Sequence, residues 1–261
     1  MYKLNDFLHL LEQFAPLELS YKMIEKGCYD NSGIIVRHHD NVENVLFTLD
    51  LSLLAVEKAK ELGCDTVVTH HPAIYNPIKT LDVFGENCAV ASALANGLNV
   101  ISMHLNLDVA SGGVDDCLCL GLGGKNVKAF DLIDGTNGYG KQAQIDAKSV
   151  EEFKKGIEEK FESQKILAYG NGIVKNIASF CGGGAQQALE ALEKGCDDVD
   201  TIITSDIPHH VLLSLIEHGK NVLIIPHYVA EQYGFNKFYA NVLNECKQNV
   251  KAHYFTDKRF M

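Results

Sequence analysis

Five side chains of types that bind metal ions follow predicted β-strands. The β-branched strand 66–69 leads into two consecutive histidines, the strand that opens at Asn99 is followed by an aspartate, and a later strand is followed by a histidine and a glutamate. These residues are His70, His71, Asp108, His227 and Glu231. Imidazole and carboxylate ligands suit Zn, Fe, Mn, Co or Ni. Because ligands of α/β sheets bind outside the carboxyl ends of the strands, this placement indicates a metal site.

The chain carries one strand–helix–strand pattern twice. Each copy begins where a predicted helix ends at Gly-Cys-Asp, at 63–65 and at 195–197. A β-branched strand comes next (201–204 in the second copy), then polar residues rich in histidine, a helix, and a strand that opens with Asn-Val. This last strand ends on His104 in the first copy and on His227 in the second. Two such copies facing one another would bring the five residues into one cleft.

The spacing of the candidate ligands favours two metal ions. His70 and His71 are adjacent, so they point to opposite faces of a strand end and suit one ion each. A carboxylate such as that of Asp108 can bridge two cations. His227 and Glu231 are four residues apart and share one face if a helix begins there. Taken singly, the histidine pair also fits an exposed loop, Asp108 the start of a turn-rich loop, and Glu231 a charge that complements a helix dipole.

Other polar residues lie beside these candidates in the sequence. Asp206 and His209 follow the strand of the second copy and are candidates for a general acid, a general base or groups that orient a ligand. Capping of the next helix by Asp206 is the alternative. His104 is expected to support the ligands from outside the metal's own coordination. The glycines 182–184 separate a strand from a helix, which favours a tight turn, with a phosphate cradle as the alternative.

Composition narrows the classes of function. The chain has 261 residues and a formal net charge of -11, which disfavours sequence-independent binding to a nucleic-acid backbone. The eight cysteines include no Cys-x-x-Cys pair and are expected to be reduced, as in a cytoplasmic protein. The N-terminal segment lacks the features of a signal peptide, and no apolar run has the length of a membrane span.

Interleaved strand and helix patterns predict the α/β class. We expect two similar α/β units with mixed sheets covered by helices and the metal site in the cleft between them. The expected ranges are 1–127 for the first lobe and 128–230 for the second, with a C-terminal helix and strand at 231–261 that return to the first lobe. Ser149 is the expected N-cap of a charged helix.

Six segments of the chain resemble the Nif-three-like dinuclear metal-centre family, whose members are often called GTP cyclohydrolase I type 2 homologues. They are "YDNSGIIV" (29–36), "VVTHHPAIYNPIKTL" (67–81), "SMHLNLDVASGGVDD" (102–116), "FCGGG" (180–184), "TSDIPHH" (204–210) and "PHYVAE" (226–231). The resemblance implies that His70, His71, Asp108, His227 and Glu231 hold two metal ions, and that the protein is a ring-shaped homohexamer. Three residues differ from those usual in the family, and none of them replaces a ligand: Tyr29, Leu105 and Ala230.

The resemblance also suggests a reaction. A hydrolase of this kind would use water activated by two metals to attack guanine C8 of GTP, open the ring and release formate. Two alternatives remain at this stage. One is a different metallohydrolase acting on phosphoesters or amides, and the other is a metal-binding scaffold protein without catalytic activity.

Overall fold

The computed structural model describes residues 1–193, 198–246 and 249–261, and it divides the chain into two compact units. The first unit consists of Met1–Ala110 and Phe235–Lys258, and the second of Ser111–Gly234 with Arg259–Met261. The first division falls earlier than the expected boundary at 127 because α6 (Val114–Gly121) packs against strands of the second unit. The chain returns to the first unit at Phe235, within its last helix.

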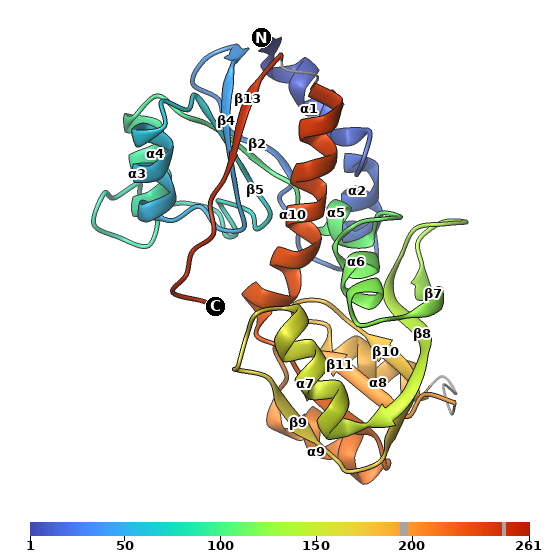
Figure 1. Ribbon diagram of the computed structural model, residues 1–261. Helices are drawn as coiled ribbons and strands as arrows, with labels where there is room; N and C mark the ends of the chain where they lie inside the picture. The colour runs from blue at the N-terminus through green and yellow to red at the C-terminus, as the bar shows by residue number, and fades with distance from the viewer. Residues whose placement is uncertain (194–197, 247–248) are drawn as a thin grey trace. The chain divides into compact units, whose positions relative to one another are not determined.

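The first unit is built on a five-stranded sheet in the order β13-β4-β5-β6-β2 (Figure 1). Its first four strands are parallel neighbours, and β2 pairs antiparallel to β6. The strands are β2 (Gly33–Val36), β4 (Asn44–Thr48), β5 (Thr66–Thr69), β6 (Asn99–Ser102) and β13 (Lys251–Tyr254). A separate antiparallel pair joins β1 (Tyr2–Lys3) to β3 (Asn41–Val42). Residues of β4, β5 and β6 are almost wholly buried, as expected for parallel strands covered on both faces.

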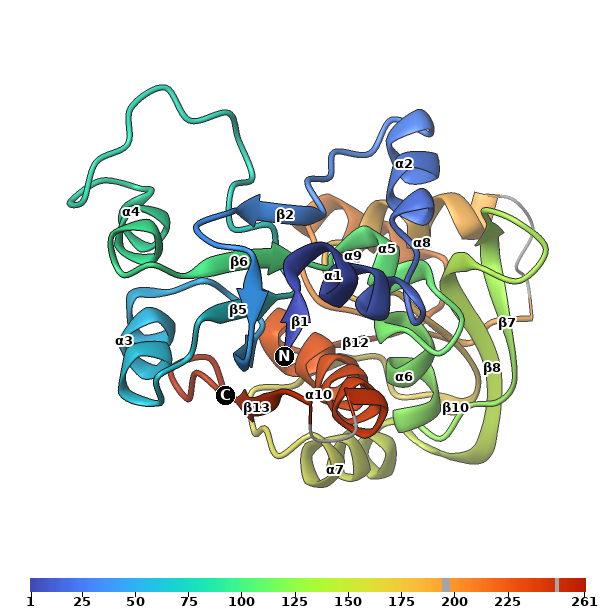
Figure 2. The same cartoon turned by 90° about the horizontal axis from the view of Figure 1, so that it is seen from above.

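Helices of the first unit surround this sheet. They are α1 (Leu4–Glu12), α2 (Leu17–Glu25), α3 (Leu53–Glu61), α4 (Cys88–Ala95) and α5 (Leu105–Val109), together with the part of α10 (His227–Cys246) from Phe235 onward. A core cluster on the α3 and α4 side contains Leu46, Val56, Val67, Leu98 and Val100. A long irregular loop separates β5 from α4, and Figure 2 shows it as the teal segment that leads into α4.

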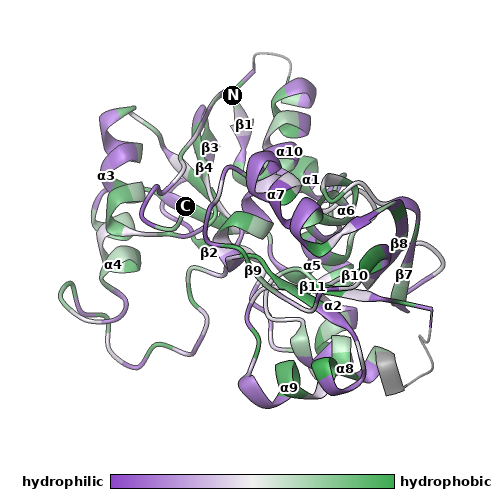
Figure 3. Ribbon diagram, turned by 60° about the horizontal axis from the view of Figure 1, so that its bottom comes forward, coloured by the Kyte–Doolittle hydropathy of each residue, from purple (hydrophilic) through white to green (hydrophobic). Residues whose placement is uncertain are grey.

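The second unit is built on a six-stranded mixed sheet in the order β7-β8-β10-β11-β12-β9. Its strands are β7 (Lys125–Leu132), β8 (Gly138–Ser149), β9 (Leu167–Tyr169), β10 (Ile173–Ser179), β11 (Thr201–Thr204) and β12 (Asn221–Ile224). Its helices are α6, α7 (Val150–Lys160), α8 (Ala185–Glu193), α9 (His209–Glu217) and the first turns of α10. Figure 3 shows β10 and β11 in the hydrophobic colour, whereas α7 carries hydrophilic segments. The α/β class with mixed sheets and covering helices is therefore confirmed.

The two sheets repeat one arrangement of strands. β4, β5 and β6 are parallel neighbours with antiparallel β2 beyond β6, and β10, β11 and β12 are parallel neighbours with antiparallel β9 beyond β12. The central register also matches, because Thr66 faces Asn99 in the first unit and Thr201 faces Asn221 in the second. The strand–helix–strand pattern read twice from the sequence is therefore a structural repeat.

An aspartate at the start of the central strand fixes each copy of the repeat. Asp65 accepts hydrogen bonds from the amides of Glu43 and Asn44 and from the Thr66 hydroxyl. Asp200 accepts the same three kinds of bond, from the amides of Lys175 and Asn176 and from the Thr201 hydroxyl. The sequence matched Asp65 with Asp197, which lies outside the described residues. In the structure Asp200 has the contacts that Asp65 has.

Replacing Asp200 with alanine is expected to lower the free energy of unfolding by about 2 kcal/mol, because two backbone N–H groups lose their acceptor. Urea unfolding of the variant measures this. The matched control is Asp198→Ala, since Asp198 is exposed and is expected to change stability by less than about 0.5 kcal/mol. Equal stability of the two variants would contradict a structural role for Asp200.

Several local features predicted from the sequence are present in the structure. The Ser149 hydroxyl accepts a hydrogen bond from the Glu152 amide, and the Glu152 carboxylate accepts one from the Ser149 amide, so α7 begins with a capping box. The seven described cysteines are free thiols. Among the described residues, no helix combines the length and the apolar character needed to cross a bilayer.

Candidate metal centre

His70 follows β5 directly, and its ring is fully buried. Its Nδ1 lies 2.8 Å from the carbonyl oxygen of Met103, just after the neighbouring strand β6. A carbonyl oxygen can only accept a hydrogen bond, so Nδ1 carries the proton. In the neutral ring Nε2 then has a free lone pair of electrons to offer. The backbone therefore sets the tautomer of His70 that suits a metal ligand.

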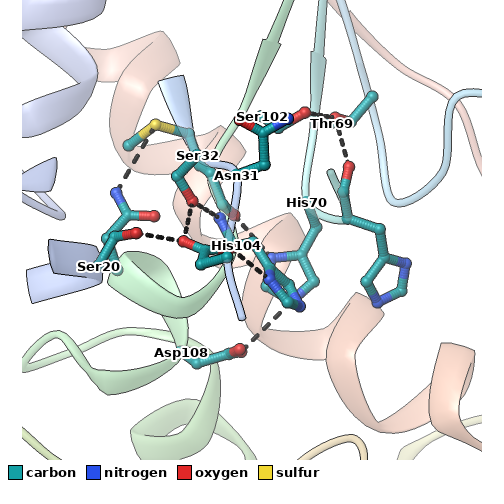
Figure 4. Close-up of polar contacts among 12 residues, drawn as sticks. Ser20, Asn31, Ser32, Thr69, His70, Ser102, His104 and Asp108 are labelled. Atoms are coloured by element: carbon teal, nitrogen blue, oxygen red, sulfur yellow. Dashed lines mark hydrogen bonds and ion pairs between the residues drawn. The ribbon is translucent and has the colours of Figure 1, made fainter. Parts of the chain in front are cut away.

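The carboxylate of Asp108 faces this lone pair. Asp108 lies on the short helix α5, is 4% exposed, and places Oδ1 3.3 Å from Nε2 of His70 (Figure 4). A lone pair and a carboxylate oxygen are both acceptors, so they repel unless a cation or a second proton lies with them. A doubly protonated ring in a fully buried position is costly. The donor set and its burial thus fit a divalent cation.

His71 has the same kind of support from a different strand. Its Nδ1 lies 2.7 Å from Oδ1 of Asp50, which follows β4. The carboxylate accepts a hydrogen bond from Nδ1–H, so Nε2 is the nitrogen that can coordinate a metal. One ligand nitrogen of His71 and one of His70 lie within 4.8 Å of each other. The ends of the neighbouring strands β4, β5 and β6 therefore place and orient the two histidines.

His104 completes a cluster of three imidazole rings. The ring centroids are 5.0 Å apart for His70 and His71, 5.4 Å for His70 and His104, and 5.7 Å for His71 and His104. Nδ1 of His104 lies 2.8 Å from Oδ1 of the buried Asp30. All three rings in this unit thus use Nδ1 as the donor to a neighbouring oxygen.

Asp30 is held in its charged form by several donors. Burial by itself would raise the pKa of Asp30, but the hydrogen bond and charge of His104 and the hydroxyls of Ser20 and Ser32 outweigh it and lower the pKa. Ser32 Oγ also accepts a hydrogen bond from the His104 amide, 3.1 Å away, as Figure 4 shows. This network fixes His104, which agrees with a supporting position near the candidate ligands.

In the second unit, His227 and Glu231 lie on the first turns of α10. Nδ1 of His227 is 2.6 Å from Oδ2 of Asp206, and Nε2 is 3.0 Å from Oε2 of Glu231. With Nδ1 donating a hydrogen bond to Asp206, a proton or a cation must lie between Nε2 and the Glu231 oxygen. The arrangement found at His70 and Asp108 is repeated, and a helix does begin where the i, i+4 spacing requires it.

The glycine-rich turn before α8 packs against this pair. Gly182 has φ of +59°, and a Cβ there would lie 2.5 Å from Oε1 of Glu231. Cys181 is buried, and its Sγ lies within 4.8 Å of a carboxylate oxygen of Glu231. Its carbonyl accepts a hydrogen bond from the Tyr139 hydroxyl, and its amide donates to Asp115. The turn therefore lies against Glu231 so closely that position 182 has no room for a side chain.

The other candidates take different positions. Asp206 contacts His227 and so orients a candidate ligand. His209 is exposed in the first turn of α9, beyond Pro208. His70, His71, His104 and Asp108 gather in the first unit, and Asp206, His227 and Glu231 in the second.

Three supporting residues were missed in the sequence. Asp30 and Cys181 lie in two of the segments that carry the family resemblance, but neither was singled out as a site residue. Asp50 offered a usable signal, because it follows β4, and parallel β5 is its neighbour. Carboxyl ends of adjacent parallel strands lie at one edge, so a carboxylate there is a candidate partner for His71.

The fold and these residues define a mixed α/β protein with candidate metal ligands at the ends of its strands. The chain belongs to the Duf34/NIF3 (NGG1p interacting factor 3) family, whose model matches residues 2–259. Its relatives include a GTP cyclohydrolase 1 type 2 homolog of Clostridium perfringens, 29% identical over 99% of this chain and 95% of that protein. A Lactococcus lactis protein with the same description is 27% identical over 96% of this chain and 95% of its own.

Solved structures share the fold. Staphylococcus aureus hypothetical protein SA1388 aligns with a TM-score of 0.83 and 25% identity over 98% of this chain and 96% of that one. Reduced HcgD from Methanocaldococcus jannaschii aligns with a TM-score of 0.79 and 24% identity over 98% of both chains, a similarity of fold.

Proposed function

We propose that His70, His71, Asp108, His227 and Glu231 hold two divalent metal ions. The observation that carries this proposal occurs once in each unit. A histidine gives its Nδ1 proton to a neighbouring oxygen while its Nε2 lies 3.0–3.3 Å from a carboxylate oxygen. A proton or a cation must lie between two such atoms, and carboxylate–histidine support of this kind is usual around bound metals.

We propose further that the centre serves a hydrolase acting on a purine nucleotide, with GTP as the first candidate. Support comes from the description that several relatives carry. Two divalent cations would supply Lewis acidity and lower the pKa of water. The chain's own residues hold the donors in place: Asp50, Asp206 and the Met103 carbonyl fix three tautomers. His104, charged or neutral, is held by Asp30 beside the ligand rings.

The test is formate release from GTP by purified protein loaded separately with Zn, Mn, Fe, Co or Ni, together with the count of tightly bound ions per chain. The expected result is two ions and formate production with at least one metal. One tightly bound ion after careful reloading would overturn the dinuclear centre. Two ions without formate from any purine nucleotide would overturn the cyclohydrolase and favour another metallohydrolase or a metal-binding scaffold.

We propose that the protein assembles as a homo-oligomer, with a hexameric ring as the specific form. The support is the family resemblance. Light scattering across a range of concentrations measures the mass, and a particle of 28.7 kDa throughout would contradict assembly.

Replacing Asp206 with alanine is expected to weaken metal binding about 10- to 100-fold, because the Nδ1 proton of His227 loses its acceptor and the ring can turn. Competition with a chelator measures the affinity. Asp146→Ala is the control, since Asp146 is exposed and pairs with Lys125 at the surface. Unchanged affinity in the Asp206 variant would remove this carboxylate from the support of the centre.

A further inference from the structure

Two exposed tyrosines of the first unit, Tyr29 and Tyr75, pack against each other. The ring centroids of Tyr29 and Tyr75 are 4.8 Å apart at an interplanar angle of 58°. Tyr29 is 45% exposed and Tyr75 is 52% exposed. Tyr29 directly precedes Asp30, the partner of His104, and Tyr75 lies four residues after His71. Tyr75 is therefore near one clustered histidine along the chain, and Tyr29 adjoins the residue whose carboxylate holds another.

Hydrogen bonds hold the backbone of both tyrosines. The side-chain amide of Asn31 donates to the carbonyl of Ile74 over 2.8 Å and so joins the segment of Tyr29 to that of Tyr75. The amide of Ala73 donates to the Ser102 hydroxyl at the end of β6, 3.1 Å away. The two rings are thus presented by fixed segments, even though Tyr75 lies at the start of a long loop. Prior ordering of this kind lowers the entropy cost of binding.

Tyr75 also lines a cavity of about 490 Å³. The wall of this cavity begins at Pro72, the residue after His71, and its polar side chains include Asn76, Lys79, Glu86 and Asn87. A cavity of this size falls in the range of small-molecule sites, and its lining is mainly polar with the Tyr75 ring among it. An aromatic wall takes a planar ring on its face, amide side chains match the polar edge of a heterocycle, and a lysine suits an anionic substituent.

We propose that Tyr75 is a binding residue that stacks the heteroaromatic base of a nucleoside or nucleotide, and that Tyr29 positions the Tyr75 ring. The inference rests on the proposed function for the identity of the reaction, and it adds the part of the protein that binds the base. The cavity receives the base, and the sugar and phosphate extend toward Lys79 or solvent. Side chains that carry no ring at position 75 remove the stacking surface and leave the candidate metal ligands in place.

The experiment is titration calorimetry of the full-length, metal-loaded protein with guanosine, GMP and ribose 5-phosphate. Tyr75→Leu is expected to lower the affinity for guanosine and for GMP about tenfold, a usual loss for one stacked base. The affinity for ribose 5-phosphate is expected to stay unchanged. Tyr75→Phe keeps the ring and is expected to bind guanosine within about twofold of the wild type. Tyr21→Leu is the matched control, because Tyr21 is 59% exposed on α2 and does not line the cavity.

The outcomes separate this inference from the proposed reaction. Guanosine binding that Tyr75→Leu leaves unchanged overturns the stacking site, and so does a wild-type protein that binds no guanosine. Formate release from GTP with an unchanged KM in Tyr75→Leu keeps the hydrolase and overturns the stacking site. Base binding that depends on Tyr75, in a protein that releases no formate, supports the stacking site and overturns the cyclohydrolase reaction.

Discussion

Asp108→Ala is expected to abolish formate release from GTP and to reduce the number of bound ions. The carboxylate is 4% exposed and faces Nε2 of His70, so its loss removes a proposed ligand and the negative charge that Asp108 places beside that ring. A fall in turnover of about 10³-fold or more is expected, since two-metal hydrolysis depends on both ions. The readouts are formate release and metal content under matched loading.

Two variants make this result specific. Asp40→Ala removes an exposed carboxylate of the same unit that pairs with Arg37, and it is expected to change neither readout. His209→Ala is expected to slow turnover and to keep a normal metal content, because we propose a role for His209 with the substrate and outside the ligand set. Full metal content together with full turnover in Asp108→Ala would remove Asp108 from the centre.

The repeat was predictable from the sequence because its determinants are local. β-branched runs such as 66–69 and 201–204 predict strands, and a helix between two strands predicts parallel pairing. Asp197, which the Gly-Cys-Asp motif matches with Asp65, lies outside the described residues. The contacts of Asp65 with backbone amides at the start of the parallel neighbour β4 recur at Asp200, which accepts two backbone amides of the parallel neighbour β10. A residue's partners across the sheet decide such a match, and they are not adjacent in sequence.

The supporting carboxylates show the same limit. Asp30 and Asp50 lie 74 and 21 residues from the histidines that they hold. Only the strand order β4-β5-β6 brings Asp50 beside His71, and only the segment before β2 brings Asp30 to His104. The division at Ala110 has a related cause, because α6 belongs to the second unit through packing on β8 and β10. The types of the candidate ligands and the ends of the strands could be predicted from the sequence. The contacts that orient these side chains could be identified only from the three-dimensional structure.

The glycine turn 182–184 offers a sharp comparison of two neighbouring positions. At Gly182 an added Cβ would lie 2.5 Å from Oε1 of Glu231 and 3.4 Å from the His227 ring, and the φ of +59° disfavours any side chain. Gly182→Ala is therefore expected to cost about 1–2 kcal/mol of folding free energy. It is also expected to weaken metal binding about 10- to 100-fold, because Glu231 must move.

Gly183→Ala is the matched control, since a Cβ there meets no atom within 4 Å. Its stability and metal affinity are expected to stay within about 0.5 kcal/mol of the wild type. Urea unfolding and chelator competition on both variants measure the difference, and equal effects would contradict a close contact between the turn and Glu231.

Gly183 also lines a cavity beside Gln186 and Asp206. If Gly183→Ala raised the KM for GTP with metal content unchanged, the turn would bind a phosphate in addition to making room for Glu231, because a methyl group there would obstruct backbone N–H groups at the start of α8.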